Sequence, residues 1–268
     1  MTPDQQVERV RLDVLLAERG LFETRSKAAA AVIAGEVFVG AGRDRVSKPG
    51  QMLASDSVLE IADTRRFVSR GGTKLENALT TLGLEVEGVR AIDVGASTGG
   101  FTDCLLQRGA SDVIAVDVAY GELAWSLRQD PRVFVIERKN AREMELADLP
   151  WQPSFAVCDV SFIAVAKVMP AIARVLPDGG EGVLLVKPQF EVGKDAVGRG
   201  GVVRDPAVRR SALISAAQAA QENGLGLVGF ASSELPGPKG NQETFVHVRK
   251  GLSTSESDLH AMAERAEP

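Results

Sequence analysis

The 268-residue sequence is poor in the residues that metal sites and base-stacking surfaces need. It contains two cysteines and two histidines, and none of them lie at the spacing of a zinc site, so we expect no metal. Cys104 and Cys158 each lie within an apolar stretch, which is typical of reduced, buried thiols in a cytoplasmic protein. Aromatic residues make up 5% of the chain, which argues against a platform that stacks the bases of single-stranded nucleic acid.

Long apolar runs are also missing. No run approaches the roughly 20 residues that a membrane-spanning helix needs, and the first ten residues lack the basic-then-apolar order of an export signal. We therefore expect a cytoplasmic protein that does not enter membranes. The net charge of −5 gives no overall sign of nucleic-acid binding. Its distribution gives a weak one, because residues 1–70 hold 11 basic and 10 acidic side chains, whereas the remainder holds 20 and 26.

The most informative segment that is present covers positions 90–107 and reads RAIDVGASTGGFTDCLLQ. An apolar run ends in Asp93, after which Gly95, Gly99 and Gly100 fall within six residues and an amphipathic segment follows. A buried strand, a glycine turn and a helix start together place backbone amides close to a ligand. The segment therefore predicts a cofactor site, and with it an enzyme.

An acidic residue after the next apolar run narrows the type of cofactor. The run 113–116 ends in Asp117, at the position where a carboxylate can bind the hydroxyl groups of a ribose. A dinucleotide fingerprint would need a second glycine where Ser97 stands, so the glycine pattern of an oxidoreductase is interrupted. The loop instead resembles the adenosylmethionine loop of class I methyltransferases. That resemblance implies S-adenosyl-L-methionine as the cofactor.

Apolar runs alternate with segments of helical period from about Ser69 onward. This alternation predicts an α/β fold with a mostly parallel, doubly wound sheet of seven strands, which the loop resemblance makes a class I (Rossmann-like) methyltransferase domain. In such a sheet the ligand crevice lies outside the carboxyl ends of the strands, where Gly95, Asp117 and Asp159 fall. The expected strands are 91–94, 113–118, 133–136, 155–159, 182–187, 227–232 and 245–248, and the expected helices are 74–82, 100–107, 122–128, 164–175 and 206–223.

The first seventy residues have a different pattern. Residues 9–19 are compatible with a short helix that Gly20 ends. Thr24 or Ser26 can cap a second helix that stops at Gly35. Short strands at 37–39 and 58–61 follow, so we expect a small α+β unit.

Three stretches of this unit, RLDVLL at 11–16, TRSKA at 24–28 and AGEVFV at 34–39, resemble the RNA-binding domain of small-subunit ribosomal protein four. The resemblance covers about Val7 to Ala62. Cationic side chains and free amides at a helix start suit a phosphate, although an ordinary solvated helix start would have the same residues. The expected RNA-binding residues are Arg11, Arg25, Ser26, Lys27, Arg65 and Arg66.

The predicted organisation has four parts. The segment 64–68 is either a plain linker or a further RNA contact. The polar tail forms a last helix over 259–265 or frays. The boundaries are 1–63 for the RNA-binding domain, 64–68 for the linker, 69–251 for the methyltransferase domain and 252–268 for the tail.

Two further strand ends carry unusual residues. The run 155–158 leads into Asp159, and the run 183–186 leads into Lys187. Pro188 cannot continue the ladder of a central strand, so Lys187 should face the ligand crevice where the chain leaves the sheet. A lysine at the border of an apolar core can serve as a base because burial disfavours the charged form, although a lysine that merely reaches solvent is the simpler alternative.

Lys74, Asp159, Lys187 and Glu243 occur in an order that resembles the catalytic tetrad of heat-shock-type (FtsJ-like) ribose 2′-O-methyltransferases. Stretches along nearly the whole chain resemble the TlyA family still more closely, among them VSRGGTKLENAL, DVGASTGGFTDCLLQRGA, LLVKPQFEVGK and LPGPKGNQE. The resemblance implies a ribosomal RNA cytidine 2′-O-methyltransferase that acts on the small and large subunits.

We assign roles on this basis. Lys187 would be the general base for the 2′-hydroxyl, and Asp159 would orient it. Lys74 and Glu243 would position the ribose. The expected cofactor-binding residues are Ser69, Arg70, Gly71, Asp93, Gly95, Ala96, Ser97, Gly99, Gly100, Phe101, Asp117, Asn140, Asp159 and Phe162.

Other functions stay open at this level. The family also carries the label haemolysin, so a cytolysin is one alternative, although no segment favours membrane insertion. A non-catalytic RNA-binding assembly factor is another. An oxidoreductase ranks last because Ser97 interrupts the fingerprint. We expect a monomer whose partner is ribosomal RNA within ribosomal subunits.

Overall fold

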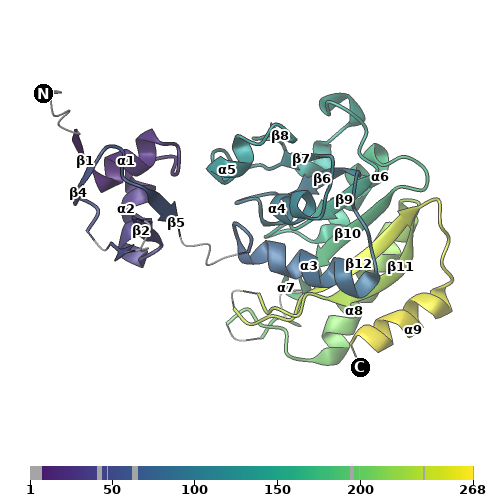
Figure 1. Ribbon diagram of the computed structural model, residues 1–268. Coiled ribbons are helices and arrows are strands. Elements are labelled where there is room, and N and C mark those ends of the chain that lie inside the picture. The colour runs from purple at the N-terminus through teal and green to yellow at the C-terminus, as the bar shows by residue number, and fades with distance from the viewer. Residues whose placement is uncertain are drawn as a thin grey trace, which may run out of the picture. The chain divides into compact units, whose positions relative to one another are not determined.

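The computed structural model describes residues 8–40, 44–46, 48–61, 66–193, 196–198, 200–237 and 239–267. The chain separates into two compact units, Met1–Arg66 and Phe67–Pro268 (Figure 1). Arg65, one of the expected RNA-binding residues, lies outside the described residues.

The N-terminal unit combines two helices with short antiparallel strands. Its described elements are β1 (Arg9–Arg11), α1 (Leu12–Glu18), α2 (Arg25–Ala34), β2 (Val37–Val39), β3 (Asp44–Arg45), β4 (Met52–Ala54) and β5 (Leu59–Ile61). β1 pairs with β4, and β2 lies between β3 and β5. The helices pack against each other over a small apolar core that includes Leu12, Leu16, Ala28 and Val32.

The first predicted helix is wrong at its start. Arg9–Arg11 form strand β1, in which Val10 lies opposite Leu53 of β4. A three-residue strand is too short for an apolar period to reveal it, and its partner lies far along the chain. The second helix agrees with its prediction, because Thr24 Oγ1 accepts a hydrogen bond from the Lys27 amide at 3.2 Å and Gly35 ends the helix with φ 74°.

The second unit confirms the predicted α/β fold with a mostly parallel, seven-stranded sheet. Its strands are β6 (Arg90–Val94), β7 (Asp112–Val116), β8 (Val133–Ile136), β9 (Phe155–Cys158), β10 (Glu181–Val186), β11 (Leu225–Ser232) and β12 (Thr244–Lys250). Their spatial order is β11-β12-β10-β9-β6-β7-β8. The strands β6 to β10 are parallel, whereas β12 is antiparallel to both of its neighbours.

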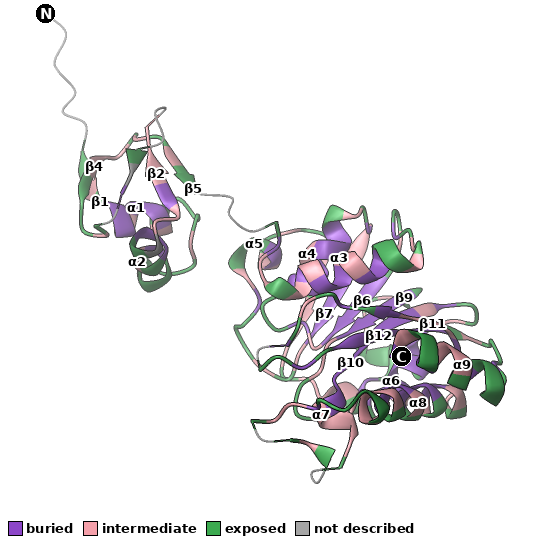
Figure 2. Ribbon diagram, turned by 90° about the horizontal axis from the view of Figure 1, so that it is seen from below, coloured by how far each residue is buried: buried purple, intermediate pink, exposed green. Residues whose placement is uncertain are grey.

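Helices cover both faces of this sheet. They are α3 (Arg70–Leu82), α4 (Gly100–Gln107), α5 (Trp125–Arg128), α6 (Met169–Val175), α7 (Pro188–Glu191), α8 (Pro206–Glu222) and α9 (Glu256–Ala266), with short 3-10 turns η1 (Ala141–Glu143), η2 (Leu146–Asp148) and η3 (Val165–Lys167). In Figure 2, α3 and α4 lie on one face and α6, α8 and α9 on the other. Neighbouring residues of a strand therefore enter different cores: Ala91 packs on the α3 side and Ile92 on the α6 side. Burial on both faces explains the continuous apolar runs in the sequence.

Some helices begin or end at other residues than predicted, because polar capping side chains, which the hydrophobic pattern does not reveal, determine where a helix starts. α3 begins at Arg70 instead of Lys74, because Ser69 Oγ accepts a hydrogen bond from the Gly71 amide at 3.3 Å and caps the helix. The predicted helix 164–175 is divided into η3 and α6. Of the two alternatives for the tail, the helix forms: α9 buries Leu259 and other apolar side chains against the second unit.

Candidate active site

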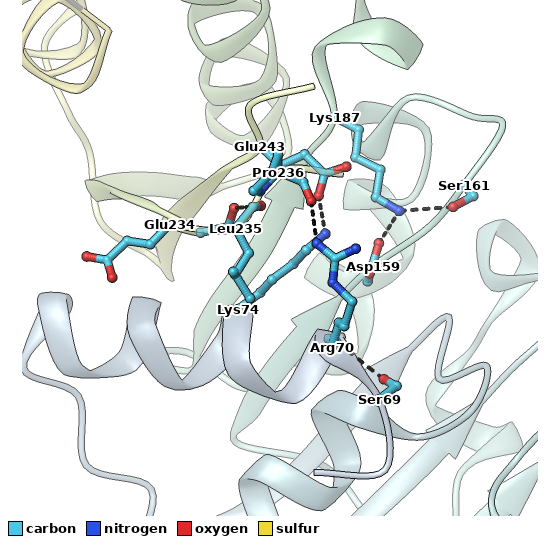
Figure 3. Close-up of polar contacts among 12 residues, drawn as sticks. Ser69, Arg70, Lys74, Asp159, Ser161, Lys187, Glu234, Leu235, Pro236 and Glu243 are labelled. Carbon is cyan, nitrogen blue, oxygen red and sulfur yellow. Dashed lines mark hydrogen bonds and ion pairs between the residues drawn. The ribbon is translucent and has the colours of Figure 1, made fainter. Parts of the chain in front are cut away.

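Three of the predicted catalytic residues meet at one edge of the sheet because of how the strands run. β9 and β10 are parallel neighbours, so Asp159 and Lys187 follow their strands at the same edge. β12 is antiparallel to β10 and begins at that edge, directly after Glu243. Lys74 reaches the same place from α3, as Figure 3 shows.

The four side chains form two ion pairs (Figure 3). Lys187 Nζ contacts a carboxylate oxygen of Asp159 and donates a hydrogen bond to Ser161 Oγ at 2.9 Å. Lys74 Nζ donates to Glu243 Oε2. Lys74 is 7% exposed and Glu243 is 2% exposed, so this second pair is almost fully removed from water. Buried charges of this kind are tolerated only when paired, so the pair ties α3 to the start of β12.

The chain between β11 and β12 shapes one wall of the site. Arg70 of α3 donates a hydrogen bond to Pro236 O at 2.9 Å, which fastens this loop to the helix. A Cβ atom on Gly237 would collide with Glu243 Oε1, so a larger residue there would displace that carboxylate. That carboxylate oxygen is buried and accepts no hydrogen bond within the described part of the chain. The loop therefore encloses Glu243 and, as far as its described residues go, leaves one carboxylate oxygen without a hydrogen-bond donor.

The glycine segment after β6 has backbone geometry that glycine adopts without strain. Gly95 has φ 84° and Gly99 has φ 96°. A Cβ atom on Gly95 would lie 2.6 Å from the carbonyl oxygen of Asp159, and one on Gly99 would overlap a leucine side chain. Gly100 is equally enclosed, because a Cβ atom there would overlap Ser69 Oγ. The loop is thus packed between the end of β9 and the start of α3.

Two residues predicted to bind the cofactor face the core instead of the loop surface. Asp93 is fully buried, and its Oδ2 accepts hydrogen bonds from the Thr102 amide at 2.9 Å and from Thr102 Oγ1 at 2.7 Å. Burial raises the pKa of Asp93 to about 7. The ring of Phe101 packs against Phe245, with centroids 5.7 Å apart. Any contribution of these two side chains to cofactor binding therefore acts through the shape of the loop.

A cavity of about 540 Å³ lies beside the glycine loop. Asp117 occupies one wall, where its carboxylate accepts hydrogen bonds from the Ser97 amide at 2.7 Å and the Ala119 amide at 2.8 Å. Of the expected cofactor-binding residues, the lining contains Gly95, Ser97, Asp117, Asn140, Asp159 and Phe162.

The cavity fits a nucleoside cofactor. Its volume falls in the range of small-molecule pockets, roughly 300–1,000 Å³. Gly95 lines the cavity and has no side chain, so a ligand there could approach its backbone closely. A carboxylate such as that of Asp117 can accept hydrogen bonds from ribose hydroxyls, and an amide such as that of Asn140, whose Nδ2 donates to Glu143 Oε1 at 2.8 Å, can pair with a base edge. Both roles stay predictions.

An aromatic pair, of which Phe162 lines the cavity, lies beside it. Phe162 is 89% exposed and has φ 68°, a backbone conformation that is uncommon for a residue other than glycine. Its ring centroid lies 5.7 Å from that of Phe190, which follows Lys187 on α7. Strained, exposed residues of this kind gather at functional sites.

The other expected cofactor-binding residues lie around the loop and do not line the cavity. They are Ser69, Arg70, Gly71, Ala96, Gly99 and Gly100, and their contact with a cofactor stays a prediction.

The sequence analysis did not identify Ser161, although its place two residues after Asp159 was a usable signal. Glu122 was also missed; its carboxylate accepts a hydrogen bond from Ser97 Oγ at 3.1 Å.

Glu191 is a third residue that sequence reasoning missed. It lies on α7, four residues after Lys187, and its Oε1 accepts a hydrogen bond from the Val165 amide of η3 at 2.7 Å. Burial raises the pKa of Glu191 to about 7. The contact ties the segment after β10 to the segment after β9, and no sequence pattern could have revealed it because the partner is a backbone amide.

Three of the expected RNA-binding residues of the N-terminal unit form ion pairs with acidic side chains. Arg11 and Arg25 both contact Asp13, at the starts of α1 and α2. Lys27 pairs with Glu23 one helical turn away. Ser26 and Arg66 are exposed. RNA contacts by these residues stay a prediction.

Comparison with known proteins identifies the family of the chain. Residues 67–250 match the FtsJ-like methyltransferase family. The 16S/23S rRNA (cytidine-2'-O)-methyltransferase TlyA of Mycobacterium tuberculosis is 46% identical over 243 residues, which are 90% of each chain. Hemolysin A of Brachyspira hyodysenteriae is 40% identical over 239 residues, which are 89% of this chain and 99% of that protein.

A solved structure of a proposed hemolysin from Streptococcus thermophilus is also similar, with a TM-score of 0.71 and 41% identity over 97% of this chain and 96% of that one. Among the described residues, no helix has both the length and the apolar character to cross a bilayer, and no three histidine, cysteine or acidic side chains gather as metal ligands would. The matches cover nearly the whole chain with high identity. The chain belongs to the TlyA family of FtsJ-like methyltransferases.

Proposed function

We propose that this protein transfers a methyl group from S-adenosyl-L-methionine to the ribose 2′-hydroxyl of cytidines in ribosomal RNA of the small and large subunits. The observation that carries the proposal is the pair of ion pairs, Lys187–Asp159 and Lys74–Glu243, at the sheet edge beside the glycine-lined cavity. The name of the Mycobacterium tuberculosis relative supports the choice of cytidine and of both subunits.

The cavity residues would hold the cofactor. S-adenosyl-L-methionine supplies a methyl group that its sulfonium centre makes electrophilic. The backbone at Gly95 and Ser97 would approach it closely, and Asp117 would accept hydrogen bonds from the ribose hydroxyls. Asn140 would meet the adenine edge. Ser69 and its neighbours at the start of α3 would keep the loop in place.

Lys187 would be the general base. In the transfer, a bond would form between the ribose 2′-oxygen and the methyl carbon, the bond from that carbon to sulfur would break, and Lys187 Nζ would accept the hydroxyl proton. The amine can accept this proton only after it has given up its own, and Asp159, in contact with Nζ, is the acceptor at hand. Ser161 holds the amine in place at 2.9 Å. Lys74 and Glu243 would then fix the position of the ribose.

The N-terminal unit would bring the substrate to this site. Arg11, Arg25, Ser26 and Lys27 would contact RNA phosphates, which position a nucleic acid without reading its sequence. The proposed partner is ribosomal RNA within ribosomal subunits, bound by a monomer in the cytoplasm.

Methyl transfer to ribosomal subunits tests the proposal. Subunits from cells that lack this protein are incubated with purified protein and radiolabelled S-adenosyl-L-methionine, and labelled riboses are mapped. We expect wild-type protein to label cytidine 2′-oxygens. Lys187→Ala should abolish labelling while the cofactor still binds. Lys187→Arg keeps the positive charge but cannot lose a proton, so it should be equally inactive, and an active Lys187→Arg enzyme would contradict the role of base.

Two other outcomes would favour other functions. The name of the Brachyspira relative makes cytolysis the second candidate, and lysis of red cells that Lys187→Ala retains would support it. Binding of subunits without any transfer of label would instead indicate an assembly factor.

A further inference from the structure

A buried carboxylate joins two arginines in the N-terminal unit. Asp13 is 5% exposed, and it lies in the first turn of α1. Its Oδ1 accepts a hydrogen bond from Arg11 Nε at 3.0 Å, and its Oδ2 accepts one from Arg11 Nη2 at 2.9 Å. Arg25, at the first position of α2, donates to the same Oδ2 at 3.3 Å. Two cationic side chains, one at the end of β1 and one at the start of α2, are thus brought to one point.

Both guanidinium groups still present unused donors. The side chain of Arg11 is 48% exposed and that of Arg25 is 59% exposed. Within the described residues, Arg11 Nη1 and the Nε and Nη1 atoms of Arg25 have no hydrogen-bond partner. The guanidinium of Arg11 also lies against the turn at Gly50, where a Cβ atom would be 3.1 Å from Nη1. The guanidinium of Arg11 therefore lies between Asp13 and the turn at Gly50, and part of it faces solvent.

We propose that Asp13 is a positioning residue for a phosphate site formed by Arg11 and Arg25, and that its ligand is a backbone phosphate of RNA. The inference rests on the proposed function, because it specifies how the N-terminal unit grips that RNA. Guanidinium forks match the oxygen geometry of phosphate. Two guanidinium groups and one carboxylate leave one positive charge, which a single phosphodiester neutralises.

Asp13 contributes by organising the arginines in advance. Without it, two like charges on long side chains would repel each other, and each would lose rotamer freedom when a ligand bound. The bonds from Arg11 lower the pKa of Asp13 to about 2, so the carboxylate is charged at any pH at which RNA binding is measured. Asp13 is itself held in place, because its amide donates to Pro49 O at 2.9 Å.

The expected effect of Asp13→Asn on RNA affinity is opposite to the effect expected from charge alone. Removing a negative charge from an RNA-binding surface normally tightens binding, because binding depends on the positive charges that neutralise phosphates. Asp13→Asn should instead weaken binding of the full chain to purified 16S ribosomal RNA by roughly tenfold, the effect of losing one charge-assisted contact. Glu23→Gln is the matched control. It also removes one negative charge, from the exposed pair with Lys27, and should leave the affinity unchanged or tighter.

A mutational cycle separates positioning from general damage. In the background Arg11→Gln/Arg25→Gln, Asp13→Asn should have no further effect on RNA affinity, since the side chains through which it acts are gone. Gly50→Ala tests the same idea with Asp13 intact, because the added methyl group presses on Arg11, and it should weaken binding a few-fold. Thermal unfolding of each variant shows whether the N-terminal unit remains folded. If Asp13→Asn unfolds, the RNA affinity of Gly50→Ala tests the positioning role in its place.

The outcomes are distinct. A folded Asp13→Asn variant that binds RNA as tightly as wild type, or an effect that persists in the double-arginine background, would overturn the positioning role. Loss of binding to phosphatidylglycerol vesicles with unchanged RNA affinity would also overturn it, in favour of a lipid ligand. Wild-type protein that neither binds nor methylates ribosomal RNA would refute the proposed function itself.

Discussion

A Cβ atom placed on Gly95 would lie 2.6 Å from the carbonyl oxygen of Asp159. The two residues follow β6 and β9, which are hydrogen-bonded neighbours in the sheet. The cofactor loop and a predicted catalytic residue therefore share one close contact, and a side chain at Gly95 would disturb both.

Gly95→Ala should accordingly lower the affinity for S-adenosyl-L-methionine by at least tenfold, and the free energy of unfolding by about 2 kcal/mol. Calorimetric titration and urea unfolding measure the two effects. Gly121→Ala is the control, because Gly121 has φ 76° but nothing within 4 Å of an added Cβ atom. Equal losses of affinity in both variants would show that backbone strain, and not the contact with Asp159, is responsible.

The buried pair of Lys74 and Glu243 predicts strong coupling in stability. Lys74→Met leaves a buried carboxylate without its counter-charge and should lower the free energy of unfolding by about 3–5 kcal/mol. In Lys74→Met/Glu243→Gln the unpaired charge is gone, so the double variant should be more stable than the single one. Urea unfolding of both single variants and the double variant completes the cycle, and additive losses would contradict a direct pair.

Glu191 predicts a dependence of stability on pH. Its pKa is about 7 in the folded protein and 4.5 ordinarily, so the folded state retains a proton that the unfolded chain releases between these values. The free energy of unfolding should therefore fall as the pH rises through that window, and the loss is complete above about pH 7. Glu191→Gln keeps an acceptor for the Val165 amide but cannot titrate, so the fall should be smaller by about 2 kcal/mol.

The pKa of Asp93 is also raised, so the free energy of unfolding of Glu191→Gln should still fall somewhat as the pH rises. Urea unfolding at pH 5 and pH 8 is the measurement. Identical pH profiles for wild type and Glu191→Gln would show that Glu191 ionises normally.

Replacement of Asn241 should lower the turnover of the enzyme without weakening cofactor binding, because Asn241 supports the loop that holds Glu243. It is almost fully buried, its Oδ1 accepts from the Val203 amide at 2.9 Å, and its Nδ2 donates to Gly201 O at 2.8 Å. Asn241→Ala leaves both backbone groups without this partner, which should cost about 2–3 kcal/mol of stability and loosen the loop that holds Glu243. Its exposed neighbour Gln242 provides the control Gln242→Ala. Weakened cofactor binding in Asn241→Ala would contradict this separation of roles.

The long buried strands could be predicted from sequence because a parallel sheet between two helical layers is buried on both faces. Its strands therefore consist of continuous apolar residues. For the same reason Asp159 and Lys187 could be placed together, since both end such runs. β1 could not be predicted, because only its pairing with β4 makes it a strand. The partners of Asp13 and Glu191 could not be predicted either, since a contact between residues of different elements or with a backbone amide leaves no periodic signal.

The reversed direction of β12 has a consequence for biosynthesis. Glu243 returns to the edge of the sheet after the chain has already made five parallel strands, α8 and β11. Until that last hairpin emerges from the ribosome, the carboxylate that pairs with Lys74 in the folded protein is missing, although the helix of Lys74 was synthesised long before. The active site is therefore closed by nearly the last part of the domain to be made, and a nascent chain that stops short of β12 carries an unneutralised lysine where the finished protein has a salt bridge.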